Sequence, residues 1–117
     1  MTSLRRYNRL DQFTFHHVIA ESAGVSLVFF TKQGCKSCGM WRHQLQSLLT
    51  KRLDVRLFEV DAEQEQGLAR EFEIFHLPAL YVFKDGQFYG ELQSEARLEV
   101  IQQALSTILS GSPQDMP

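Results

Sequence analysis

The sequence contains few cysteines, few prolines and no long apolar run. Among its 117 residues there are two cysteines, both in one short segment, and three prolines. Two cysteines are too few for the disulfide framework of a small secreted protein, so we predict a reducing, cytoplasmic environment. Residues 1–11 hold no apolar core of signal-peptide length. The apolar runs at residues 25–30 and 78–83 are far shorter than a membrane-spanning helix, so we expect no membrane partner.

An excess of charge of either sign is also absent. Twelve basic and fourteen acidic side chains give a formal net charge of -2, so no overall field favours nucleic acid, and we expect no nucleic-acid partner. The length suits one domain with its own hydrophobic core. We therefore predict a single domain over residues 1–117, with its core at about 7–110 and a flexible tail at 111–117.

The order of apolar patterns predicts an α/β fold. Residues 25–30 are nearly continuous in apolar character, which is typical of a central strand covered on both faces. After Gly34, apolar residues recur every three or four positions and predict a long helix. The pair Asp85-Gly86 predicts a hairpin between two late strands. The expected strands are 7–10, 25–30, 55–60, 80–83 and 87–92, and the expected helices are 12–22, 35–52, one after 61–64 and one after Ser94.

Three residues are predicted to mark the ends of helices. Asp61 opens an acidic segment, residues 61–64, which we interpret as the cap and first turn of the third helix. Ser94 is predicted to cap the last helix, and Gly111 to end it. The alternation of strands and helices before the hairpin indicates parallel strand pairs, and the hairpin adds an antiparallel pair.

Both cysteines, Cys35 and Cys38, lie at the predicted start of the long helix. A pair with this spacing can form a reversible disulfide, supply half of a metal site, or remain an inert buried pair. Unpaired backbone N–H groups at a helix start and the positive charge of Lys36 both favour the thiolate form of Cys35. Because Cys38 lies one turn deeper, we predict that Cys35 attacks a partner disulfide and that Cys38 resolves the mixed disulfide.

The order of these segments resembles the thioredoxin superfamily. The resemblance covers about residues 7–110, and it is carried by the strand at 25–30 before Cys35-Lys36-Ser37-Cys38, by Leu77-Pro78 ahead of an apolar strand, and by Lys84-Asp85-Gly86. It implies a three-layer sandwich, with a central mixed sheet of about four or five strands flanked by about four helices. It also implies a cis peptide bond before Pro78, and an extended substrate segment that pairs with the backbone beside Leu77.

The resemblance further implies a set of site residues and partners. The implied partners are disulfide-containing proteins, with electrons from a reductase or a small thiol and with no bound cofactor or metal. Thioredoxins proper have tryptophan, glycine and proline where this chain has Gly34, Lys36 and Ser37. The implied catalytic residues are Cys35 and Cys38, and the implied substrate-binding residues are Gly34, Lys36, Ser37, His76, Leu77 and Pro78.

A pair of buried charges that the superfamily carries near the cysteines is missing. Phe29 aligns with the carboxylate of that pair, and Leu57 aligns with its lysine partner. Glu59 and Asp61 could replace the missing acid, but we interpret them as a strand-end carboxylate and a helix cap. Divergence at these positions predicts a thioredoxin-like protein that differs from an ordinary thioredoxin.

The predicted function is that of a thiol-disulfide oxidoreductase that reduces or exchanges protein disulfides. One alternative is a thioredoxin-like adaptor that binds a partner segment at the Leu77-Pro78 groove with little turnover. A second alternative is a dimer that shares its cysteine pairs around zinc or an iron-sulfur cluster. For the metal alternative, His76 and His43 are the histidines that could lie nearby, and a groove-lining His76 and a solvated His43 are the preferred interpretations.

Overall fold

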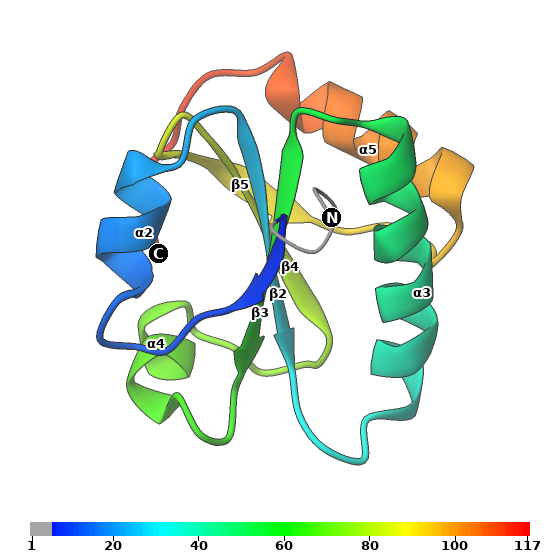
Figure 1. Cartoon of the computed structure of the whole chain (residues 1–117). Helices are drawn as coiled ribbons and strands as arrows, with labels where there is room; N and C mark the ends of the chain where they lie inside the picture. Colours follow the sequence, from blue (N-terminus) through cyan, green and yellow to red (C-terminus); the bar gives the residue numbers. More distant parts are fainter. Residues whose placement is uncertain (1–5) are drawn as a thin grey trace.

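Residues 6–117 are described by a computed structural model, and within them the chain forms five strands and four helices (Figure 1). This arrangement confirms the predicted α/β class. The strands are β1 (Tyr7–Arg9), β2 (Val25–Thr31), β3 (Val55–Asp61), β4 (Ala79–Lys84) and β5 (Gln87–Leu92). The helices are α2 (Phe15–Glu21), α3 (Lys36–Lys51), α4 (Gln66–Glu71) and α5 (Leu98–Leu109).

The five strands form one mixed sheet in the order β1-β3-β2-β4-β5. Strand β2 lies at its centre and is buried at every residue, as its continuous apolar character predicts. It pairs in parallel with β3 and antiparallel with β4. Strands β4 and β5 form the predicted antiparallel hairpin around Asp85-Gly86. Strand β1 pairs in parallel with β3 at the far edge of the sheet.

Helices cover both faces of the sheet and create two hydrophobic cores. Helices α3 and α5 lie on one face, and α2 and α4 lie on the other (Figure 1). Successive side chains of β2 point alternately to the two faces: Leu27 and Phe29 join the core under α3 and α5, whereas Val28 and Phe30 join the core under α2 and α4. Burial on both faces fixes the position at which β2 ends and the cysteine segment begins.

The last helix does not begin at Ser94, so that prediction is wrong. Helix α5 starts at Leu98, with Arg97 in extended conformation at the N-cap position and no side-chain cap. The Ser94 hydroxyl instead donates a hydrogen bond to the carbonyl of Glu95 at 2.9 Å. The Ser94 hydroxyl is therefore engaged within its own loop and does not cap α5.

The acidic segment after β3 is also not the first turn of a helix. The Asp61 carboxylate accepts hydrogen bonds from the backbone N–H groups of Glu63 (2.9 Å) and Gln64 (3.1 Å), so it closes a turn. Helix α4 begins later, at Gln66, with Glu65 at its N-cap position and no side-chain cap. The expected helix cap at Asp61 is therefore corrected to a turn.

The C-terminal tail, residues 111–117, is exposed throughout. It still contacts the sheet at one point, because the Gln114 N–H donates a hydrogen bond of 2.7 Å to the carbonyl of Phe88 in the outer strand β5. Within residues 6–117, none of the helices is both long and apolar enough to cross a membrane.

Candidate active site

The cysteine segment connects the C-terminal end of the central strand β2 to the first turn of α3. Cys35 and Cys38 form a disulfide, with Cys35 as the N-cap residue of α3. The Cys38 N–H donates a hydrogen bond to the Cys35 Sγ at 3.2 Å, so the sulfur lies where a helix start offers a free donor. Cys35 is partly exposed, whereas Cys38 is 1% exposed. Solvent and a substrate can therefore reach Cys35 far more easily than Cys38.

Three predicted substrate-binding residues surround the disulfide at the surface. Gly34, Lys36 and Ser37 are all exposed. The Ser37 Oγ lies 3.7 Å from the Cys35 Sγ. Gly34 has φ +78°, and a Cβ there would meet nothing within 4 Å, so its backbone conformation and not crowding favours glycine at this position. The rim of the disulfide is polar and open.

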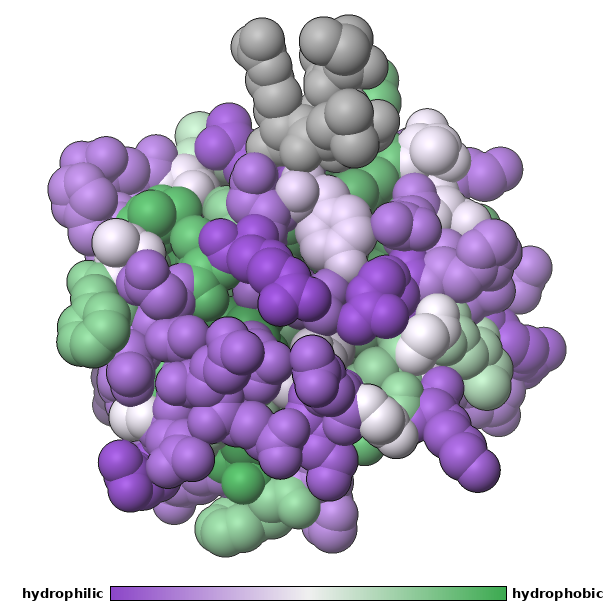
Figure 2. All heavy atoms as spheres, turned by 60° about the horizontal axis from the view of Figure 1, so that its bottom comes forward, coloured by the Kyte–Doolittle hydropathy of each residue, from purple (hydrophilic) through white to green (hydrophobic). Residues whose placement is uncertain are grey.

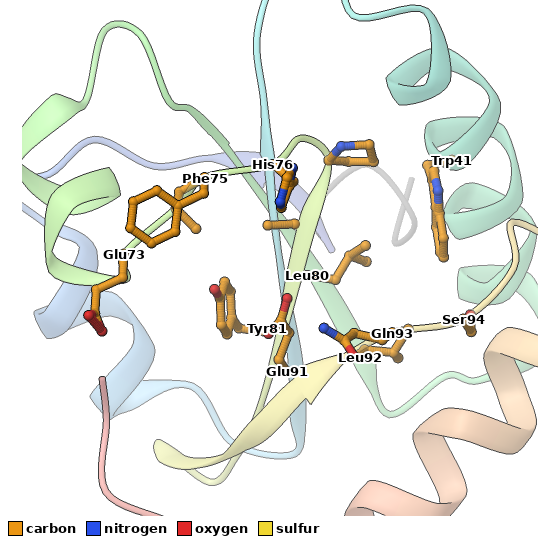
Figure 3. A pocket seen from close by; sticks show the side chains of 13 residues that line it. Trp41, Glu73, Phe75, His76, Leu80, Tyr81, Glu91, Leu92, Gln93 and Ser94 are labelled. Carbon is orange, nitrogen blue, oxygen red and sulfur yellow. The ribbon is translucent and has the colours of Figure 1, made fainter.

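A separate pocket of about 400 Å³ lies where β4 begins and β5 ends (Figure 3). Trp41 from α3 stands at one end, and Glu73 and Phe75 stand at the other, with His76 between them (Figure 3). Pro78 also lines this pocket, and the peptide bond between Leu77 and Pro78 is cis. We call this space the Trp41–His76 pocket.

The structure does not gather all predicted site residues in one cavity. His76 and Pro78 line the Trp41–His76 pocket, but the cysteines do not. Leu77 is half-buried and packs against the core under α2 and α4, so its side chain does not line that pocket. For Leu77, the backbone remains the part that an extended substrate segment can contact.

A second, polar cavity of about 250 Å³ lies against the disulfide. We call it the cysteine cavity, because Cys35 and Cys38 both line it. Its other walls include Thr31 from the end of β2, Arg42 from α3 and Glu59 from β3. Since Cys38 is almost completely buried, this cavity is its route to water.

Glu59 is buried, at 2% exposure, although its side chain is charged. Arg42 donates two hydrogen bonds to its carboxylate, from Nε at 3.1 Å and from a terminal nitrogen at 2.7 Å. Thr31 donates a third at 2.8 Å, and the Tyr7 hydroxyl donates a fourth. Arg9 lies at the edge of the group, 3.9 Å from the carboxylate. We call these residues the Glu59 cluster.

The Glu59 carboxylate and the Arg42 guanidinium are both charged at neutral pH. Burial alone would raise the pKa of Glu59, but hydrogen bonds from Arg42, Tyr7 and Thr31 outweigh it and lower the pKa from 4.5 to about 2. The bond to Glu59 raises the pKa of Arg42 above its ordinary value. Desolvation and then the bond to Glu59 raise the pKa of Tyr7 to about 12. At neutral pH Glu59 is therefore a carboxylate held by a guanidinium, and not a proton acceptor.

Glu59 lies near the end of β3, as the sequence interpretation has it, but its carboxylate is buried, which that interpretation did not include. Two signals could have found its position. Alternation along β3 puts Glu59 on the same face as Val55 and Leu57, which point into the core under α3. Arg42 follows Cys38 by four residues, so both lie on one face of α3. The register pairs Glu59 with Phe29, so a carboxylate on β3 lies directly beside the position on β2 where the superfamily carries its buried acid.

The histidines and acids do not assemble a metal site in the described part of the chain. Among residues 6–117, no group of three or more histidine, cysteine, aspartate or glutamate side chains is close enough to hold a metal ion. His43 is exposed on α3, and His76 lines the Trp41–His76 pocket.

The surface around the disulfide is mostly polar. Figure 2 turns the lower end of the molecule forward, and hydrophilic residues cover most of this face, with apolar residues at separate points. Large exposed apolar side chains include Phe75, at 84%, and Met40, at 59%.

A partly exposed cysteine at a helix start, disulfide-bonded to a buried cysteine one turn deeper on a five-stranded mixed sheet, defines the class of thioredoxin-fold thiol-disulfide oxidoreductases. The comparisons agree with this class. Residues 7–107 match the family model described as Thioredoxin. The chain belongs to the thioredoxin family.

Individual relatives support the same family. A thioredoxin of Bos taurus is 33% identical over 101 residues, which cover 85% of this chain and 94% of that protein. The thioredoxin domain-containing protein 2 of Rattus norvegicus is 32% identical over 100 residues, and this chain spans 18% of its length. The fold, taken alone, is similar to the crystal structure of mitochondrial thioredoxin 3 from Saccharomyces cerevisiae, with a TM-score of 0.74 at 23% identity. The superposition covers 93% of this chain and 99% of that chain.

Proposed function

We propose that this protein reduces or exchanges disulfides in other proteins, with Cys35 as the nucleophile and Cys38 as the resolving cysteine. The observation that carries the proposal is the unequal exposure of two bonded sulfurs at a helix start. Cys35 is partly exposed, and its Sγ accepts a hydrogen bond from the Cys38 N–H, whereas Cys38 itself is buried. A substrate sulfur can therefore approach Cys35, and Cys38 can approach only Cys35.

The reaction then follows from thiol-disulfide exchange. The Cys35 thiolate attacks one sulfur of the substrate disulfide, forms a mixed disulfide, and releases the other substrate sulfur as a thiolate that takes a proton. Cys38 loses its proton and attacks the Cys35 sulfur, so the second substrate thiolate leaves and the Cys35–Cys38 disulfide forms. Two electrons pass from the cysteine pair to the substrate. The N–H group of Cys38 and the start of α3 stabilise the attacking thiolate of Cys35.

Substrate binding is proposed on both sides of Cys35. Gly34, Lys36 and Ser37 are exposed at its rim and can contact a bound segment. An extended segment that pairs with the backbone of Leu77 would pass Pro78 and the Trp41–His76 pocket. The proposed electron donor is a reductase or a small thiol, and the proposed location is the cytoplasm, because both cysteines serve one exchangeable pair.

A second candidate is an adaptor that holds a partner segment and turns over slowly. Phe29 and Leu57 favour it, because both are completely buried apolar side chains at positions where the superfamily carries charges near the cysteines. In this candidate the Leu77-Pro78 groove would bind the partner, and the disulfide would open rarely.

Insulin reduction with dithiothreitol tests the proposal and separates the two candidates. We expect the wild-type protein to accelerate the precipitation of reduced insulin chains, and Cys35→Ser to lose this acceleration, because the attacking sulfur is gone. Ser106→Ala, on the exposed side of α5, is the control and should match the wild type. Equal rates for wild type and Cys35→Ser would reject the oxidoreductase and favour the adaptor.

A further inference from the structure

The Glu59 cluster and the disulfide open onto the same cavity, although the exchange reaction described above makes no use of the cluster. Arg42, Glu59, Cys35 and Cys38 all line the cysteine cavity. A buried ion pair costs desolvation energy, so its position beside the one inaccessible sulfur calls for a physical account.

Cys38 must become a thiolate before it can attack the mixed disulfide. Its thiol proton leaves through the cysteine cavity, because Cys38 is 1% exposed and this polar cavity is where it meets water. A negative charge on a sulfur in so buried a place is unfavourable unless a positive charge lies close by. The rate of the second step therefore depends on the charges that line this cavity.

Arg42 is placed to supply that positive charge. It follows Cys38 by one helical turn, and side chains on a helix lean toward its N-terminus, so the Arg42 side chain leans toward the turn that carries Cys38. Its guanidinium carbon lies 5.9 Å from the centre of the Phe29 ring, above the central strand. Glu59, on the next strand, holds the guanidinium there with two hydrogen bonds.

The other charged groups at or near the cysteine cavity are less able than Arg42 to change the pKa of Cys38. Arg9, at 72% side-chain exposure, and the exposed Lys32 face solvent, which screens their charges. Lys36 is exposed beside Cys35. The carboxylate of Asp61 is occupied by two backbone N–H groups of its own turn.

We infer that Arg42 is a positioning residue that stabilises the thiolate of Cys38, and that Glu59 fixes the guanidinium in place while partly offsetting its charge. This inference rests on the proposed function, since it concerns the second step of that reaction. Cys38 gives its proton to water in the cavity, and its thiolate then displaces the substrate sulfur from Cys35. Neither Arg42 nor Glu59 gains or loses a proton in the cycle.

The test is a pH titration of the reduced protein with ¹³Cβ-labelled cysteine, in which NMR follows Cys38 separately from Cys35. Arg42→Gln should raise the midpoint of the Cys38 titration by about one pH unit or more, because the cation is lost and Glu59 is left unpaired. Glu59→Gln should lower the midpoint by a similar amount, because the cation is no longer offset. Arg42→Lys keeps the charge and should stay within about half a unit of the wild type.

Arg52→Gln provides the matched control, because Arg52 also pairs with an acid, Asp54, but at the other end of α3. It should leave the Cys38 midpoint unchanged. If the cluster were merely structural, Arg42→Gln and Glu59→Gln would shift the Cys38 midpoint in the same direction, or neither would shift it. Either result would overturn the inference. Each variant has its own predicted direction, so one that fails to fold leaves the other decisive. If the wild type does not accelerate insulin reduction, the proposed function is rejected. The titration still decides by itself whether Arg42 stabilises the Cys38 thiolate.

Discussion

A carboxylate buried beneath a helix needs donors that replace its lost water, and Glu59 has them from three different elements. Tyr7 comes from β1, Thr31 from β2 and Arg42 from α3. Hydrogen bonds to a charged group are stronger than neutral ones. Glu59 therefore connects the edge strand, the central strand and the active-site helix, and its ionisation should matter for stability as well as for chemistry.

The stability of the protein should depend on the ionisation of Glu59 in mild acid. Its pKa lies at about 2 in the folded protein, below the ordinary value of 4.5, so the folded state favours the carboxylate. This contribution, about 3 kcal/mol, is present above about pH 4.5 and is lost as the pH falls toward about 2. Wild type should therefore lose more unfolding free energy between pH 6 and about 3 than Glu59→Gln, which cannot titrate there.

Urea unfolding at a series of pH values measures this difference. The exposed acids Asp11 and Asp54 also have a lowered pKa, but they are present in both proteins, so their effects cancel. If the free energies of wild type and Glu59→Gln fall in parallel, Glu59 is not stabilised as a carboxylate in the folded state.

At the residue scale, the sequence predicts the cysteines and their unequal exposure better than it predicts the groups around them. C-x-x-C at a helix start depends on local spacing, which a sequence displays. The Glu59 cluster depends on Tyr7 and Arg42, which lie 52 and 17 residues away from Glu59. Contacts between residues so far apart depend on the strand register, which local spacing in the sequence does not show.

The β4–β5 hairpin is held against α2 through its turn. The Asp85 N–H donates to the carbonyl of Gly24, and the Gly24 N–H donates back to the Asp85 carboxylate at 2.8 Å. Gly86 has φ +81°, and a Cβ there would lie 2.8 Å from the carbonyl oxygen of Ala20 in α2. The turn is therefore both conformationally restricted and closely packed.

Gly86→Ala should destabilise the protein by about 2 kcal/mol, because alanine resists positive φ and the added carbon meets backbone that cannot move easily. Gly39→Ala is the matched control: Gly39 lies inside α3, and a Cβ there meets nothing within 4 Å. That change should stabilise the protein by about 0.5 to 1 kcal/mol. Guanidinium unfolding of both variants measures the two effects, and a Gly86→Ala protein as stable as the wild type would contradict the close packing.

At the element scale, long periodic segments are predictable and short ones are not. The sixteen residues of α3 and the continuous apolar strand β2 follow directly from their patterns. Helix α4 has six residues and no side-chain cap, and α5 also starts without one. Their starts are set by tertiary packing, which explains why the caps predicted at Asp61 and Ser94 are wrong.

At the scale of the whole molecule, the fold brings distant segments to one end of the sheet. The disulfide follows β2, the Leu77-Pro78 bond precedes β4, and Glu59 lies near the end of β3. Parallel pairing of β2 with β3 and antiparallel pairing of β2 with β4 place these points at the same end. The strands, the disulfide and the cis-proline segment therefore have the thioredoxin arrangement. Phe29 and Leu57 stand where the superfamily carries a pair of buried charges near the cysteines.

The central claim is that Cys35 attacks and Cys38 resolves, and trapping the mixed disulfide tests it most directly. Reduced Cys38→Ser is mixed with insulin, free thiols are blocked by alkylation, and the products are identified by mass spectrometry without reduction. We predict that Cys38→Ser accumulates a mixed disulfide on Cys35, because the resolving sulfur is missing, whereas Cys35→Ser accumulates none. A mixed disulfide on Cys38 in the Cys35→Ser protein, formed as readily, would contradict the assignment of the two roles.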